Sequence, residues 1–160
     1  MNGKSGKILK ISLIVLVLLT LAFIFGNSLL SKETSGEESK AVSGFLEKIF
    51  PLTTEFGKFL SDNLRKIAHF VEFFALGAEL GSYVLAFIDD KKRGLSFAAL
   101  SSFFVAFFDE SLQILSGRGA EIRDVWLDFS GALTALIICA GLAYFITLLK
   151  TNEERRDTDG

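Results

Sequence analysis

Residues 11–30 read ISLIVLVLLTLAFIFGNSLL and contain no charged side chain. A helix rises about 1.5 Å per residue and the hydrocarbon core of a bilayer is roughly 30 Å thick, so a run of this length is typical of a membrane-spanning helix. Lysines precede the run, as in a secretory signal peptide, but no small-residue cleavage site follows it. We therefore expect residues 11–30 to be a retained membrane anchor.

Three further apolar runs are long enough to span a bilayer, and clusters of charge separate them. They cover residues 67–88, 95–115 and 124–149. Half of the 160 residues are apolar, and four spans leave too few residues for a separate soluble domain. The sequence therefore predicts an all-α fold, a four-transmembrane-helix bundle that forms a single membrane domain over residues 1–160.

The loop at residues 31–66 carries two short amphipathic segments. In residues 38–50, apolar side chains recur at helical spacing on one face, and Pro51 ends the pattern. Residues 53–64 show a second face of this kind. We expect two short helices here that lie in the membrane interface or cover the end of the bundle.

Lysine and arginine residues indicate how the chain is oriented. Four spans place the N-terminal tail, the connection at residues 89–94 and the C-terminal tail at residues 150–160 on one side, and each of the three carries three lysine or arginine residues. Basic flanks prefer the cytoplasm. We expect a multi-pass protein of the plasma membrane with cytoplasmic N- and C-termini and an extracytoplasmic loop at residues 31–66.

Ionisable side chains lie inside the predicted spans, where they are costly and usually serve a function. His69 and Glu72 begin the second span, residues 109–113 end the third, and Asp124 and Asp128 begin the fourth. The helical rise places all of them within roughly 10 Å of the outer boundary. An ion-paired clasp between helices is the simpler alternative, but the number of groups favours a ligand-binding site. The candidate ligand-binding residues are Lys66, His69, Glu72, Asp109, Glu110, Gln113, Arg118, Asp124 and Asp128.

Other features limit the possible chemistry. The net charge of −2 excludes the basic surface of a nucleic-acid-binding protein. Cys139 is the only cysteine and excludes a disulfide framework. Glu79 lies near the middle of the second span without an evident partner, so no direct chemical role is expected for it. We expect neither a metal ion nor a cofactor.

As a set, the polar motifs resemble the VanZ-like family of small integral membrane proteins. They are Lys66-x-x-His69-x-x-Glu72, Asp109-Glu110-x-x-Gln113, Arg118 and Asp124-x-x-x-Asp128-x-x-Gly131, and the Asn27-Ser28 pair resembles the family's serine at the end of the first span. Two positions depart from the family pattern, because Asp128 stands where asparagine is usual and Glu79 where an apolar residue is usual. The family takes its name from a protein encoded with glycopeptide-resistance genes that lowers susceptibility to teicoplanin. The resemblance therefore implies a cell-envelope protein with a part in antibiotic resistance.

Three classes of function fit these observations. The first is binding of an extracytoplasmic polar ligand, a membrane lipid headgroup or a cell-wall precursor, with Arg118 and Lys66 holding its phosphate or carboxylate. The second is a hydrolase-like intramembrane enzyme; its candidate catalytic residues are His69, Glu72, Asp109 and Glu110. A metal-assisted form of that enzyme would use His69 with the carboxylates, which favour magnesium, manganese or calcium. The third is a structural scaffold or a transporter, and transport with so few spans would require an oligomer.

Overall fold

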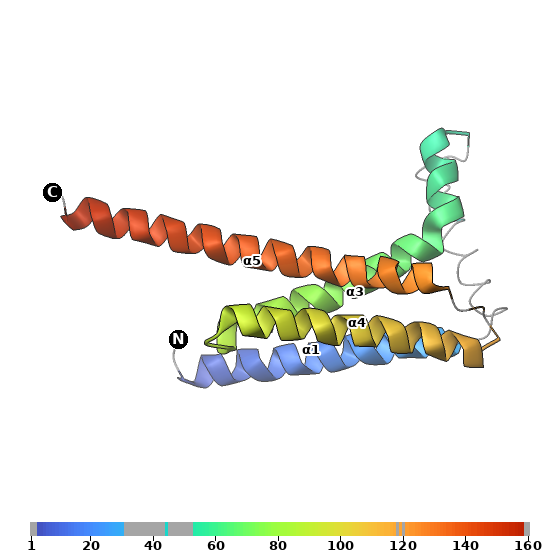
Figure 1. Cartoon of the computed structure of the whole chain (residues 1–160), viewed down its shortest axis with the longest axis horizontal. Coiled ribbons are helices and arrows are strands. Elements are labelled where there is room, and N and C mark those ends of the chain that lie inside the picture. The colour runs from blue at the N-terminus through green and yellow to red at the C-terminus, as the bar shows by residue number, and fades with distance from the viewer. Residues whose placement is uncertain (1–2, 31–43, 45–52, 118, 120, 159–160) are drawn as a thin grey trace.

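A computed structural model describes residues 3–30, 44, 53–117, 119 and 121–158. Within these ranges the chain forms helices and no strand: α1 (Gly3–Leu29), α3 (Glu55–Phe87), α4 (Lys91–Leu115) and α5 (Ile122–Thr158) (Figure 1). All four helices are long and apolar enough to cross a membrane. The predicted all-α bundle of four spans is thus confirmed. The short helix predicted at residues 38–50 lies outside the described residues.

Helix α3 is longer than the second span that the sequence predicts. The segment at 53–64, expected to form a short separate helix, is instead the first part of α3. Thr54 caps the helix, since its side chain accepts a hydrogen bond of 3.0 Å from the backbone N–H of Gly57. No proline or glycine lies between Gly57 and Gly77, so nothing in the sequence ends the helix before the span. The first turns of α3 project away from the bundle (Figure 1).

The closest approach in the bundle is between α3 and α5, and glycines make it possible. A Cβ atom at Gly77 would lie 2.7 Å from Cα of Ala132, and one at Gly131 would lie 3.2 Å from the carbonyl carbon of Phe70. The two backbones are therefore in direct contact, as at the small-residue interfaces typical of membrane helices. Because Phe70 follows His69 and Gly131 lies one turn after Asp128, this contact brings those two polar side chains together.

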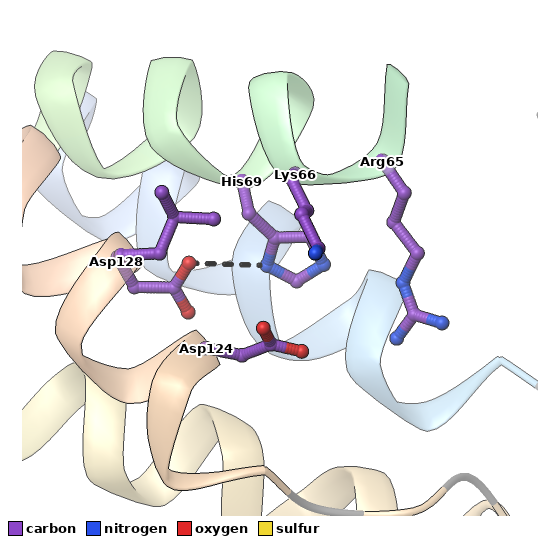
Figure 2. A pocket seen from close by; sticks show the side chains of 6 residues that line it. Arg65, Lys66, His69, Asp124 and Asp128 are labelled. Atoms are coloured by element: carbon purple, nitrogen blue, oxygen red, sulfur yellow. Dashed lines mark ion pairs between the residues drawn. The ribbon is translucent and has the colours of Figure 1, made fainter. Parts of the chain in front are cut away.

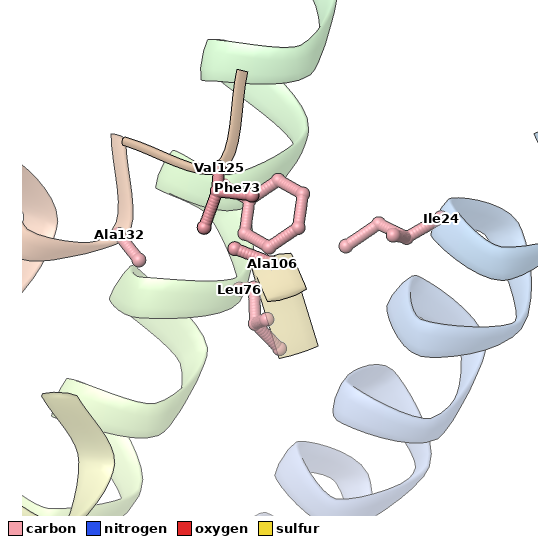
Figure 3. Packing of buried hydrophobic residues seen from close by; sticks show 6 residues of the cluster. All are labelled: Ile24, Phe73, Leu76, Ala106, Val125 and Ala132. Carbon is pink, nitrogen blue, oxygen red and sulfur yellow. The ribbon is translucent and has the colours of Figure 1, made fainter. Parts of the chain in front are cut away.

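The apolar core is small, and every helix contributes to it. One cluster of buried residues consists of Ile24, Phe73, Leu76, Ala106, Val125 and Ala132 (Figure 3), and a second consists of Val84, Ala98 and Leu136. Large apolar side chains instead cover the outside of the bundle, including Leu18, Phe97 and Phe145, each at least half exposed. Exposed apolar surface on all helices is expected where lipid replaces water as the solvent.

The start of α1 and the end of α5 lie at the same end of the bundle as the connection between α3 and α4, and α5 extends well beyond that connection (Figure 1). Asp90 caps α4 there by accepting a hydrogen bond of 2.9 Å from the backbone N–H of Arg93. The end of α1, the entry of α3 into the bundle and the connection from α4 to α5 lie at the opposite end. The polar residues of the predicted site belong to this opposite end.

Candidate functional site

Three side chains from three helices meet inside the bundle. Nδ1 of His69 on α3 lies 3.6 Å from Oδ1 of Asp128 on α5 and 3.8 Å from Oδ2 of Asp109 on α4. Both carboxyl groups are fully buried, whereas 14% of the His69 side chain is exposed. One donor atom from each residue can be chosen so that all three lie within 4.8 Å of one another. We call these three residues the His–Asp cluster.

Asp109 is held in place by hydrogen bonds from other helices and from its own. Oγ of Ser28 on α1 donates to Oδ1 of Asp109 at 2.5 Å. Nε2 of Gln113, one turn further along α4, donates to Oδ2 at 3.3 Å. Gln113 in turn accepts a hydrogen bond of 2.6 Å from the guanidinium of Arg65 on α3. The position of this carboxylate is therefore fixed by contacts to α1 and α3 as well as α4.

Asp128 has a different environment. Neither of its oxygens accepts a hydrogen bond within the described part of the chain, although both are buried. Nδ1 of His69 is likewise buried without a hydrogen-bond partner among the described residues. A buried carboxylate needs positive charge or hydrogen-bond donors nearby, since burying it uncompensated is expensive. The structure places the ring of His69 against it, with Nδ1 at 3.6 Å from Oδ1.

A cavity of about 150 Å³ opens between α3 and α5 beside the cluster. Its lining residues are Arg65, Lys66, His69, Asp124, Leu127 and Asp128 (Figure 2). Arg65 and Lys66 are exposed, while Asp128 is buried at the inner end. Since one water occupies roughly 30 Å³, the cavity has room for a few waters or a group of phosphate size.

Three buried or half-buried glutamates of α3 and α4 each accept a hydrogen bond of their own. Glu72 accepts one of 3.3 Å from Nδ2 of Asn27, and Glu110 accepts one of 2.6 Å from the backbone N–H of Glu121. Glu79 accepts one of 2.8 Å from the hydroxyl of Thr20 on α1. The sequence indicates no evident partner for Glu79, because it does not reveal which face of α1 meets α3, and the structure identifies Thr20 as that partner.

The structure gathers most of the residues predicted for the site. His69, Asp109, Gln113 and Asp128 are in contact or joined by hydrogen bonds, and Lys66 and Asp124 line the same cavity as His69 and Asp128. Glu72 lies on α3, as His69 does, but it is hydrogen-bonded to Asn27. Glu110 lies on α4, as Asp109 does, but it is hydrogen-bonded to the backbone of Glu121. Arg118 lies outside the described residues, so its expected part in ligand binding stays a prediction.

Two contributing residues were absent from the predicted set. Arg65 lies four residues before His69, a spacing that places both on one face of a helix and would have allowed its inclusion. Ser28 ends α1, and the resemblance to the VanZ-like family singled out a serine there. Its bond to Asp109 joins residues 81 positions apart, and no local pattern indicates such a pairing.

Four apolar helices around a buried polar cluster define a multi-pass integral membrane protein. A family model described as VanZ/LLP1 matches residues 11–147, which is most of the chain. The chain belongs to this family, and the resemblance read from the polar motifs is confirmed. No curated protein and no solved structure matches the chain.

Proposed function

We propose that this protein lies in the plasma membrane, with both termini in the cytoplasm, and binds an anionic group of an extracytoplasmic ligand. The ligand is a lipid headgroup or a cell-wall precursor that carries phosphate or carboxylate. The observation that carries the proposal is the cavity between α3 and α5, which combines Arg65 and Lys66 with His69 at one end of the bundle. An anion that approaches from the membrane surface meets these exposed cations first.

The chemistry of the cavity mouth supports an anion as the ligand. Arg65 already donates to Gln113, and a guanidinium has five N–H donors in a planar fork, so it can hold an anion from the same position. Lys66 adds a second positive charge. The carboxylates of Asp124 and Asp128 lie deeper in the cavity and repel an anion. The depth to which the ligand enters therefore depends on how much positive charge compensates these two carboxylates.

The charge distribution supports an outward-facing site. Both termini and the connection between α3 and α4 lie at one end of the bundle, and the cavity belongs to the other end (Figure 1). The basic residues of the two tails and of this connection favour the cytoplasm for their end. The cavity then opens toward the periplasmic or external face, where cell-wall precursors and outer-leaflet headgroups are found.

Membership of the VanZ/LLP1 family supports a role in susceptibility to glycopeptides of the teicoplanin type. Binding an anionic precursor or lipid at the outer surface would alter the amount of drug target that is accessible there. This link connects the cavity to a measurable phenotype in cells.

The test compares Arg65→Gln and Arg65→Lys with Lys58→Gln, which removes an exposed cation of α3 that does not line the cavity. Each variant is produced in a host whose teicoplanin susceptibility depends on the protein, and membrane levels are measured in parallel. Native mass spectrometry then measures binding of a lipid-linked cell-wall precursor, phosphatidylglycerol and glycerol phosphate. We expect Arg65→Gln to abolish binding and phenotype, Arg65→Lys to retain part of both, and Lys58→Gln to retain both.

The proposal is overturned if Arg65→Gln retains wild-type binding and phenotype at normal membrane levels. The three probes distinguish the sources of the anion. Glycerol phosphate has no lipid chains, so it binds only if the phosphate group alone is enough for recognition. Substrate-dependent flux in liposomes would instead indicate a transporter.

A second candidate function, hydrolysis of such a ligand, is favoured by the position of His69 between two carboxylates. Carboxylates that flank a histidine can orient it as a general base. Release of phosphate or of a headgroup from the precursor during incubation with the purified protein, lost in His69→Asn, would support an enzyme.

A further inference from the structure

We propose that His69, Asp109 and Asp128 bind a divalent transition-metal ion, which nothing in the family match assigns. The ligands would be Nδ1 of His69 and one carboxylate oxygen from each aspartate. These atoms come from α3, α4 and α5 and lie within 4.8 Å of one another. The sequence alone predicts no metal ion, because one histidine provides too few of the ligands that zinc usually has in proteins. The structure differs from this expectation, because it brings two aspartates from other helices next to His69.

The distances suit a metal site. Two ligands at about 2.1 Å from a tetrahedrally coordinated ion are ~3.4 Å apart. Nδ1 of His69 lies 3.6 Å from Asp128 and 3.8 Å from Asp109, so small side-chain rotations bring the three donors to bonding distance. Those distances are also too long for ordinary hydrogen bonds between the ring and the carboxylates. The ring of His69 and the two carboxylates thus lie close together without forming hydrogen bonds between the ring and either carboxylate, and this spacing fits an ion between them.

Asp128 provides a second and independent observation. Its carboxylate is completely buried, lines the cavity, and accepts no hydrogen bond within the described part of the chain. Figure 2 shows it directed toward the ring of His69 across the inner end of the cavity. Nδ1 of His69 is buried without a hydrogen-bond partner there as well. A cation between them would compensate both groups at once.

The surroundings of Asp109 resemble the outer shell of a metal site. Ligating carboxylates are usually oriented by further hydrogen bonds, which fix their position and leave an oxygen lone pair for the ion. Ser28 and Gln113 provide such bonds, and Arg65 in turn holds Gln113. These contacts position one oxygen of Asp109, Oδ2, on the side of His69.

The donor set indicates the kind of metal. Imidazole suits zinc and other first-row transition ions, and carboxylates suit harder ions such as manganese. One nitrogen with two oxygens therefore favours Mn²⁺ or Zn²⁺ over Mg²⁺ and Ca²⁺, which prefer all-oxygen sites. Three protein ligands leave coordination positions open, as in catalytic zinc sites.

The open positions would face the cavity, because His69 and Asp128 both line it. The ion would then turn the acidic inner end of the cavity into a site that attracts phosphate or carboxylate, beside Arg65 and Lys66. This last step rests on the proposed anion binding, whereas the metal site itself does not. The alternative is a protonated His69 that forms ion pairs with both aspartates and binds no metal.

The experiment uses the full chain, purified in detergent and stripped with a chelator. Equilibrium dialysis with Mn²⁺, Zn²⁺ and Mg²⁺ is measured for wild type, His69→Asn, Asp128→Asn and Glu79→Gln. We expect one Mn²⁺ or Zn²⁺ per wild-type chain, with weaker binding of Mg²⁺. Because second-shell changes alone cost 10–100-fold in metal affinity, loss of a ligand should cost about 100-fold or more.

Glu79→Gln is the matched control, since it removes a buried carboxylate from α3 that is bonded to Thr20 and lies outside the His–Asp cluster. Its affinity should stay within about twofold of wild type, a change of less than 0.5 kcal/mol. Equal losses in Glu79→Gln and Asp128→Asn would show that the ion binds diffusely to negative charge, and would overturn the proposal.

Pulsed electron paramagnetic resonance of bound Mn²⁺ provides a readout that does not depend on any variant. Coordination by His69 predicts coupling of the manganese to ¹⁴N in the wild-type protein. Absence of stoichiometric binding, or binding without this coupling, leaves the protonated histidine clasp as the correct description. Because no anionic ligand is present, failure of anion binding and failure of metal binding are observed separately.

Discussion

At the scale of single residues, Asp109 and Asp128 are equally buried but differently bonded. Asp109 accepts hydrogen bonds from Ser28 and Gln113, whereas Asp128 accepts none in the described structure. Replacement by asparagine should therefore change the free energy of unfolding differently at the two positions.

We expect Asp109→Asn to lower the free energy of unfolding of the metal-free protein by about 1–3 kcal/mol, because an amide cannot accept both hydrogen bonds as the carboxylate does. Asp128→Asn should leave it unchanged or raise it, since a buried charge without hydrogen bonds is removed. Unfolding in detergent with a chelator present measures both. Equal destabilisation by the two substitutions would contradict this distinction and favour a clasp in which both carboxylates are paired.

The sequence could predict several of the residues that meet in the site, but not Arg65 or the bond of Ser28 to Asp109, and only part of the pairing. Depth along each span follows from the helical rise, and it correctly placed His69, Asp109 and Asp128 at one end of the bundle. The face of α1 that meets its neighbours was not predictable, because residues 11–26 of α1 are apolar on nearly all sides. For that reason the contacts of Ser28 and Thr20 came only from the structure.

At the scale of helices, the contact between α3 and α5 determines the geometry of the site. A Cβ atom at Gly77 or Gly131 would collide with the backbone of the opposite helix, and side chains cannot move aside to relieve such a collision. A glycine one turn after Asp128, as at Gly131, is typical of a close approach between membrane helices. Its partner on α3 could not be predicted, because the register between two helices depends on their packing.

We expect Gly77→Ala and Gly131→Ala each to destabilise the bundle by about 1–3 kcal/mol through overpacking. Gly141→Ala is the control on α5, because no atom lies within 4 Å of the Cβ that it introduces. Alanine is the better helix former by roughly 1 kcal/mol, so the control should be neutral or stabilising. Thermal unfolding in detergent checks all three, and a stabilised Gly131→Ala would refute the close contact.

The helix boundaries of α3 show where local patterns mislead. Pro51 and the polar residues before Ile67 suggested a separate short helix at 53–64, but a helix ends only where its backbone bonding is interrupted. Polar residues alone do not interrupt it, and α3 continues through Arg65 and Lys66 into the membrane span. Arg65 and Lys66 at the mouth of the cavity therefore belong to the same helix as His69.

At the scale of the whole molecule, the orientation in the membrane is the main untested expectation. In a background that lacks Cys139, single cysteines at Ser39 and Ser116 should react with an impermeant thiol reagent in intact cells. A cysteine at Lys92, in the connection at the other end of the bundle, should react only after the cells are lysed. The reverse pattern would place the cavity in the cytoplasm and remove the basis for an extracytoplasmic ligand.

The distribution of the polar residues has a consequence for biosynthesis. Ser28, His69, Asp109 and Asp128 come one from each helix, so the last partner reaches the membrane only when α5 has left the ribosome. Until then, His69 and Asp109 lie in partly assembled spans that lipid tolerates poorly. Nascent chains halted before α5 should therefore stay bound to the insertion machinery or be degraded by membrane proteases, which makes completion of the polar interior a checkpoint for release.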